Sequence, residues 1–208
     1  MLNLMIKNLI KKVPGAKAIR KLFFYKKKNK GPQWCRIVMD KSTKEWINAL
    51  PKDSLNVLEI SGTKWSSFDF KTYRSLNFPD FDICEDKTNE NYDLIIAEQV
   101  FEHLKYPYRA GKNIYEMLSQ DSYFLITTPF LIKIHNHPID CSRWTPDGLK
   151  YFLHECGFKL ENIRVEAWGN RKCVMGNFKS WKVYNPMFHS LQNEDNFPLV
   201  VWALAKKE

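Results

Sequence analysis

The sequence predicts an α/β domain in which a mostly parallel sheet is covered by helices on both faces. Short apolar runs of strand length alternate along the chain with segments of helical periodicity. The runs are apolar on consecutive residues, as expected for strands that are buried on both faces. A chain of 208 residues is long enough for one such domain and a short appendage.

Six apolar runs are predicted to be strands. The clearest are residues 56–60, which end in a turn at Ser61-Gly62, and residues 92–97. The remaining runs also have strand length and are bounded by turn residues, as at Pro129. They cover residues 72–76, 123–127, 163–168 and 199–205.

Helices are predicted between these strands, at residues 34–50, 109–118 and 146–155, and a helical stretch is predicted to begin at 98–104. The helix at 146–155 has the strongest boundary signals. Thr145 is a favoured N-cap and Pro146 a favoured first residue, while Gly157 is typical of the position just after a helix. Few residues separate Gly62 from Thr72, so the helix after the first strand is predicted to be very short.

The positive charge of the chain is concentrated at its N-terminus. The formal net charge is +9, but residues 1–31 hold ten of the 32 lysines and arginines and no acidic residue. The other 22 basic residues are balanced by 23 acidic ones, so the body of the protein is close to neutral. A fold that binds nucleic acid usually carries basic charge on its body, so no nucleic-acid partner is expected.

Residues 1–31 are predicted to form a basic amphipathic helical segment, followed by a domain at 32–208. Their apolar residues recur at steps of three and one, which places them on one helical face. This face comprises Leu2, Met5, Ile6, Leu9, Ile10 and Val13. Such a helix is typical of an anchor on an anionic membrane surface. A helix packed on the domain, a solvated tail and, less favoured, a nucleic-acid arm are the alternatives.

The cysteines favour a reducing compartment. There are five, an odd number, and none forms a C-x-x-C pair: Cys35, Cys84, Cys141, Cys156 and Cys173. Reduced thiols and a cytoplasmic location are therefore expected, with possible attachment to the inner face of the membrane through the N-terminal segment. No apolar run reaches the length of a membrane span.

Three segments resemble one family. The first is Val57-Leu-Glu-Ile-Ser-Gly62, the second covers residues 92–104 and includes Glu-His-Leu, and the third covers residues 123–130. Together with residues 144–149 and 155–158, they are similar to class I S-adenosylmethionine-dependent methyltransferases of the type 11 kind. The resemblance spans residues 55–205. It implies a Rossmann-like fold with a seven-stranded sheet, and S-adenosylmethionine as cofactor.

The resemblance also implies a cofactor site at the carboxyl ends of the first, second and fourth family strands. The implied residues are Glu59, Ser61, Gly62, Asn77, Glu98 and Gln99. The chain departs from the family pattern in two places. A single, shifted glycine is followed by Lys64 and Trp65 where the methionine end of the cofactor would lie, and Asn77 replaces the usual acidic residue after the second strand. A domain of this fold that has lost the cofactor site is therefore the alternative.

The richest polar segment is His135–Arg143. His135 or His137 is a candidate base for an oxygen acceptor, oriented by Asp140, and Arg143 a candidate ligand for a phosphate or carboxylate. Loop hydrogen bonding with Arg143 paired to Asp140 is the simpler alternative. A His-x-His pair can also bind a metal, but the resemblance already explains a polar loop here, so no metal is expected. His103 is interpreted as a hydrogen-bonded residue inside a helix.

These patterns predict S-adenosylmethionine-dependent methyl transfer to a small or lipid-linked acceptor, with O-methylation in a glycan or envelope pathway as the specific hypothesis. A non-catalytic binding or scaffold protein of the same fold is the alternative. A nucleic-acid methyltransferase is disfavoured, because Ala97-Glu-Gln-Val stands where an Asn/Asp-Pro-Pro-Tyr type motif would be expected. The aromatic-rich residues 169–198 are predicted to be a lid, a dimer contact or packing on the sheet edge.

Overall fold

One six-stranded sheet organises the part of the chain that the computed structural model describes, residues 31–208. The strand order is β2-β1-β3-β4-β6-β5, and only β6 runs antiparallel to its neighbours. The strands are β1 (Asn56–Ile60), β2 (Thr72–Leu76), β3 (Tyr92–Glu98), β4 (Leu118–Pro129), β5 (Ile163–Trp168) and β6 (Val200–Lys206). All six predicted strands are confirmed. The predicted helical segment at 1–31 lies, but for its last residue, outside the described residues.

The expected seventh strand does not form between β2 and β3. Within the described residues, 77–91 form turns and loop instead. Pro79 lacks the N–H group that a sheet ladder needs, and several acidic residues follow it. Asp82 accepts a hydrogen bond from the backbone N–H of Cys84, and Asp86 accepts one from that of Asp82. Such local bonds compete with strand pairing, so the prediction of seven strands was wrong and β2 forms an edge of the sheet.

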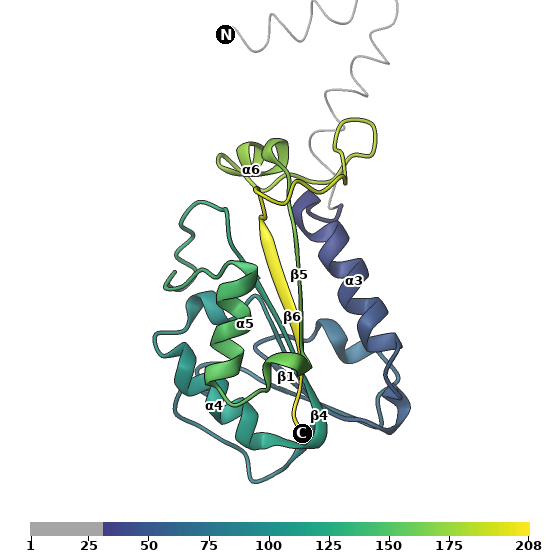
Figure 1. The fold of residues 1–208 in the computed structure, drawn as a ribbon, viewed down its shortest axis with the longest axis vertical. Helices are drawn as coiled ribbons and strands as arrows, with labels where there is room; N and C mark the ends of the chain where they lie inside the picture. Colours follow the sequence, from purple (N-terminus) through teal and green to yellow (C-terminus); the bar gives the residue numbers. More distant parts are fainter. Residues whose placement is uncertain (1–30) are drawn as a thin grey trace, which may run out of the picture. The chain divides into compact units, whose positions relative to one another are not determined.

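Helices cover both faces of this sheet (Figure 1). On one face α4 (Pro107–Met117) and α5 (Pro146–Glu155) bury residues such as Ile114 and Phe152. On the other face α3 (Ile37–Asn48) buries Met39 and Ile47, and α6 (Arg171–Asn177) contributes to the same core. The predicted boundaries of α5 are confirmed: the Thr145 side chain accepts a hydrogen bond from Gly148 N–H, and Gly157 has a φ of +123°.

One local prediction needs correction, and a second is confirmed. The helical stretch expected at 98–104 is only the 3₁₀ turn Phe101–His103, so His103 does not lie inside an α-helix. An α-helix cannot begin at Glu98, because Gln99 has a φ of +57° and its backbone N–H bonds to the carbonyl of Thr127. After β1, the expected very short helix is the 3₁₀ turn Lys64–Ser67. Its Trp65 is fully buried.

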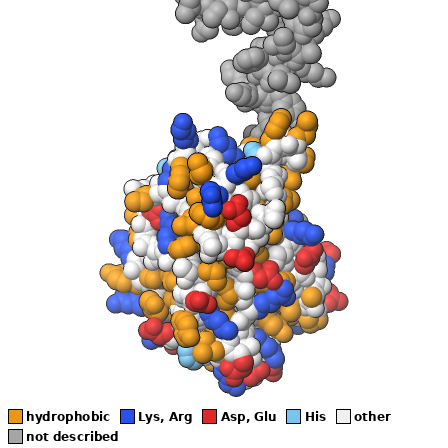
Figure 2. All heavy atoms as spheres, turned by 45° about the horizontal axis from the view of Figure 1, so that its top comes forward, with side chains coloured by type: hydrophobic (Ala, Val, Ile, Leu, Met, Phe, Trp, Pro, Cys, Tyr) orange, Lys and Arg blue, Asp and Glu red, His pale blue; other side chains and the backbone are white. Residues whose placement is uncertain are grey.

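The surface of the described domain has mixed charge. On the face drawn in Figure 2, acidic and basic side chains are interspersed with apolar ones, in keeping with the balanced composition of the body. No helix among residues 31–208 is both long and apolar enough to cross a membrane. All five cysteines are free thiols, and Cys141 alone is exposed.

Candidate functional site

The carboxyl ends of β1 and β3 are adjacent, because the two strands pair in parallel. Glu59, on β1, is only 2% exposed and holds the loop that follows. Its carboxylate accepts hydrogen bonds from the backbone N–H groups of Lys64 (3.1 Å) and Trp65 (3.0 Å) and from the hydroxyl of Tyr73 (2.6 Å). Burial, and then the Glu59 carboxylate, raise the pKa of Tyr73, which keeps this hydroxyl a donor.

The turn between Glu59 and Lys64 is tight. Ser61 takes a φ of +55°, and its N–H bonds to the carbonyl of Leu76 at 2.8 Å. A Cβ atom on Gly62 would lie 2.4 Å from Oε1 of Glu59. Any side chain at position 62 would therefore displace the Glu59 carboxylate that holds the loop, which explains the glycine there. The Gly62 carbonyl in turn accepts a hydrogen bond from the hydroxyl of Ser75 on β2.

Glu98, the last residue of β3, is the centre of a charged group formed by Arg36, Asp40, Lys64 and Glu98, here called the Glu98 cluster. The Lys64 ammonium lies 2.8 Å from Glu98 Oε2 and 2.8 Å from Asp40 Oδ1, and Arg36 pairs with both carboxylates. The indole N–H of Trp65 also donates to Glu98, at 3.2 Å. Burial lowers the pKa of Lys64, while its hydrogen bond to Asp40 acts in the opposite direction.

Asn77 follows β2 and is exposed. Its amide donates to the hydroxyl of Ser75 at 3.0 Å. Both side chains line an open cavity of about 680 Å³ that also includes Asp80 and Phe81. Two hydrogen bonds therefore connect Asn77 to the loop after β1, through Ser75 to the carbonyl of Gly62.

Gln99 leads into a second, smaller cavity of about 190 Å³, here called the histidine cavity. The Gln99 amide donates to the hydroxyl of Thr127 at 3.1 Å, which holds the side chain against β4. Trp181 is part of the cavity wall, and the polar residues of the lining are Gln33, Arg36, Gln99, Glu102, His103 and His135. Arg36 belongs to the Glu98 cluster as well, so the two sites share a side chain.

The predicted polar segment contributes one side of this cavity. Asp140 accepts hydrogen bonds from the backbone N–H of His135 (2.8 Å) and from two guanidinium nitrogens of Arg143. Burial alone would raise the pKa of Asp140, but these bonds outweigh it and the pKa is lowered. The pKa of His135 is lowered by burial, with Asp140 opposing the shift, so its imidazole is neutral at pH 7.

The structure brings together three of the four predicted catalytic residues, His135, Asp140 and Arg143. His137 is exposed and is not part of the cavity lining. Residues 169–198 return to the same region, where the Trp181 ring meets the His135 ring edge to face with centroids 5.9 Å apart. This segment is held to the domain in part by the indole N–H groups of Trp34 and Trp168, which donate to the carbonyls of Ser190 and Leu191.

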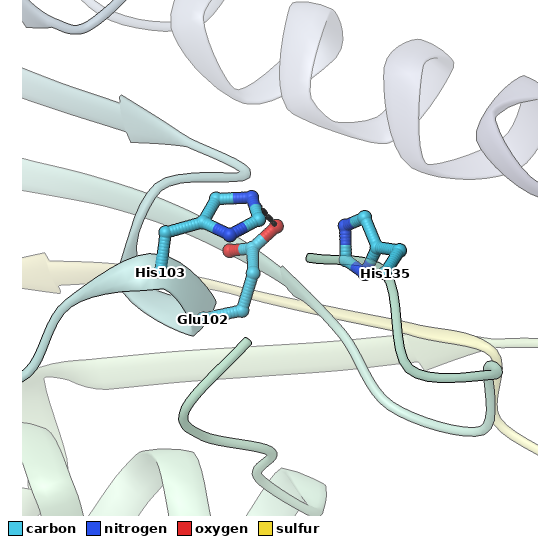
Figure 3. Close-up of side chains that lie close together, drawn as sticks. All are labelled: Glu102, His103 and His135. Atoms are coloured by element: carbon cyan, nitrogen blue, oxygen red, sulfur yellow. Dashed lines mark ion pairs between the residues drawn. The ribbon is translucent and has the colours of Figure 1, made fainter. Parts of the chain in front are cut away.

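Sequence reasoning missed Glu102, which precedes His103. Its side chain is fully buried, and among the described residues neither carboxylate oxygen has a hydrogen-bond partner. Burial raises the pKa of Glu102 to about 7. Figure 3 shows its carboxylate between the imidazoles of His103 and His135. The available signal was an acidic residue next to the histidine at the carboxyl end of a buried strand.

Solved structures with the same fold are methyltransferases. A S-adenosylmethionine-dependent methyltransferase from Archaeoglobus fulgidus has a TM-score of 0.55 at 13% identity, over 89% of this chain and 99% of that one. The corresponding protein from Mesorhizobium loti has a TM-score of 0.51 at 13% identity, over 83% and 98%. The chain has the class I methyltransferase fold. This confirms the fold that the resemblance implies, with six strands in place of seven.

A third solved structure contains ligands. Phosphoethanolamine N-methyltransferase 2 from Haemonchus contortus, in complex with phosphomonomethylethanolamine and S-adenosylhomocysteine, has a TM-score of 0.54 at 13% identity. The likeness covers 81% of this chain and 53% of that one. At these identities the likeness establishes the fold. No protein-family model matches the sequence, and no curated protein matches it significantly.

Proposed function

We propose that this methyltransferase-fold protein binds S-adenosylmethionine at the carboxyl ends of β1, β2 and β3 and transfers a methyl group to an acceptor in the histidine cavity. The observation that carries the proposal is the Glu98 cluster, in which two carboxylates hold an ammonium group at the end of β3. In open α/β sheets this edge is where ligands bind. The methionine end of the cofactor carries an ammonium group of the same kind.

The chemistry of the Glu98 cluster fits this cofactor. The Lys64 ammonium stands in for the cofactor's ammonium, and its side chain is 32% exposed on a flexible stem, which allows it to swing into solvent. Glu98 and Asp40 would then hold the ammonium, and Arg36 the carboxylate. Asn77 would hold a ribose hydroxyl without charge assistance. When bound, the cofactor supplies an electrophilic methyl group.

The chain's own residues would position the acceptor and take its proton. Methyl transfer depends mainly on alignment of the two reacting atoms, and the histidine cavity shares Arg36 with the Glu98 cluster. The neutral imidazole of His135 is a suitable general base for a hydroxyl acceptor, and Asp140 orients it from its Nδ1 side at 3.3 Å. Arg143 is not part of the cavity lining, and its guanidinium holds Asp140 in place instead.

The acceptor in this proposal is a small or lipid-linked hydroxyl compound of a glycan or envelope pathway, modified at the cytoplasmic face of a membrane. The basic and apolar residues of the N-terminal segment support it. We expect the full chain to sediment with vesicles that contain anionic lipid, and this binding to fall steeply with added salt. A variant with Lys11 and Lys12 changed to Glu should bind less. Equal sedimentation with neutral vesicles would contradict the anchor.

One observation favours a non-catalytic protein of this fold. The Lys64 ammonium already satisfies Glu98, and buried Trp65 lies beside it, so the site is complete without a cofactor. Calorimetric titration with S-adenosylmethionine and S-adenosylhomocysteine separates the two functions. Binding in the micromolar range supports the enzyme, whereas no heat and no thermal shift at millimolar ligand would give the non-catalytic function first place.

Glu59→Ala tests whether the loop after β1 forms part of the cofactor site. Three hydrogen-bond donors lose their acceptor in this variant, so the loop should loosen and the affinity for S-adenosylmethionine should fall by roughly tenfold or more. Glu155→Ala, which removes an exposed carboxylate at the end of α5, is the matched control. Unfolding curves of both variants show how much of the effect is lost stability. Unchanged affinity in a folded Glu59→Ala protein would remove this loop from the site.

A further inference from the structure

Glu102 is a buried carboxyl group without a hydrogen-bond partner. Its side chain has no exposed surface, and among residues 31–208 neither carboxylate oxygen takes part in a hydrogen bond. The nearest polar contact is the Nε2 atom of His103, at 3.6 Å from Oε1. A buried carboxylate that is ionised and unpaired is strongly disfavoured, so either a proton or a cation must compensate it.

The surrounding charges do not supply that cation. Arg143 is bound by Asp140, and Arg36 and Lys64 are bound by Asp40 and Glu98. These neighbouring carboxylates and basic groups are equal in number, which leaves Glu102 as the unmatched charge. A cation that compensates Glu102 in its ionised form therefore has to come from outside the described residues.

Two imidazoles are oriented to help bind such a cation. The Nδ1 atom of His103 faces the carbonyl oxygen of Ile139, and that of His135 faces the carboxylate of Asp140. Each histidine therefore has its Nε2 atom left to bind a ligand, and oxygen acceptors behind ligating histidines are the usual support of a metal site. In Figure 3 the Glu102 carboxylate lies between the two rings. One ligand atom from each of the three residues lies within 4.8 Å of the others.

We propose that Glu102, His103 and His135 bind a divalent transition-metal ion of the zinc class in the wall of the histidine cavity. Two imidazoles and one carboxylate are a set that zinc uses at sites with an open coordination position, and nitrogen ligands disfavour magnesium and calcium. All three residues line the cavity, so the open position would face it. With the ion bound, His135 would be a ligand and not the general base, and the ion would instead bind the acceptor's oxygen and make its proton easier to lose. That role rests on the proposed methyl transfer, whereas metal binding does not.

This site differs from the one that the sequence suggested and set aside. The His-x-His alternative pairs His135 with His137, but His137 is exposed and outside the group. Adjacent Glu102 and His103 contribute from the turn after β3 instead. The two sets of residues make different predictions for the same variants.

Cobalt titration of the full chain without an affinity tag tests the proposal. Co²⁺ replaces zinc in such sites and absorbs visible light, so the spectrum reports binding without any enzyme assay. After removal of metal with a chelator, we expect one Co²⁺ per chain, displaced by Zn²⁺. Glu102→Gln keeps the shape of the side chain and removes its charge, and we expect it to weaken binding at least tenfold, as we do for His135→Ala. Thermal unfolding verifies that both variants are folded.

Two further variants are the controls. His137→Ala and Cys141→Ser remove exposed metal-binding groups close to the site in sequence, and both should bind Co²⁺ as the unchanged chain does. Loss of binding in either control, full binding in Glu102→Gln, or no visible absorption at millimolar Co²⁺ would overturn the proposal. A chain that binds cobalt but not S-adenosylmethionine would retain the metal site and refute the methyltransferase function.

Discussion

Gly169→Ala is expected to lower the free energy of unfolding by about 3 kcal/mol, at the upper end for overpacking of a folded interior. A Cβ atom at this position would lie 2.0 Å from the carbonyl oxygen of Phe197 and 2.4 Å from the backbone nitrogen of Leu199. Both are backbone atoms next to β6, so no side-chain rotation relieves the contact. The backbone just after β5 therefore has to move away from the segment that leads into β6.

The same substitution in α6 provides the matched control for Gly169→Ala. A Cβ atom on Gly176 would make only ordinary contacts, the nearest at 3.5 Å from Lys182. Because alanine favours the helix over glycine, Gly176→Ala should be neutral or stabilising by up to about 1 kcal/mol. Denaturant unfolding of both variants measures the difference. Equal stability of the two would show that the backbone at Gly169 has more room than the structure gives it.

Gly169 also links stability to the candidate site. Its N–H and carbonyl bond to Asn193 and Glu194, which fastens the segment that carries Trp181. Separation of the chain here would release the wall of the histidine cavity. The long connection between β5 and β6 is therefore part of the site, although its sequence alone left its role open among a lid, a dimer contact and edge packing.

The sequence predicts the layers of the fold because local signals suffice for them. Buried parallel strands are apolar along their whole length, so β1 and β3 could be located to within a residue. Thr145 and Gly157 likewise mark the limits of α5 by local hydrogen bonding and backbone geometry. The absence of a strand between β2 and β3 was not predictable from the family pattern. There Asp82 and Asp86 accept hydrogen bonds from nearby backbone N–H groups, which in a strand would pair with a neighbouring strand.

The candidate site was predictable only in part, because its contacts are distant in the sequence. Glu98 and Gln99 could be placed at the end of a strand, but the pairing of Glu98 with Arg36, in the 3₁₀ turn just before α3, could not be predicted. Glu102 could not be singled out, since nothing local indicates that a carboxylate is fully buried. The pairing of Asp140 with Arg143, three residues apart, was within reach and was named as an alternative.

Substitutions at Lys64 and Glu98 should change the affinity for S-adenosylmethionine in opposite directions. Glu98→Gln removes the carboxylate that would hold the cofactor's ammonium. Because a charge-assisted bond of this kind is lost, we expect the affinity to fall by roughly tenfold to hundredfold. Lys64→Met removes the competing ammonium and leaves Asp40 and Glu98 with Arg36 alone. The cluster then carries a net negative charge, so we expect binding to become roughly tenfold tighter.

S-adenosylhomocysteine, the product of the proposed methyl transfer, provides a second test of the role of Lys64. S-adenosylmethionine carries a positive charge on sulfur that S-adenosylhomocysteine lacks, so Lys64→Met should favour the former more than the latter. Lys41→Met removes an exposed lysine of α3 whose ion pair among residues 31–208 is with Glu45, and should leave both affinities unchanged. Calorimetric titration of the three variants gives all of these values. Removal of a group that competes with the cofactor cannot lower the affinity for it. Weaker binding in Lys64→Met would therefore mean that Lys64 contacts the cofactor rather than occupying its place.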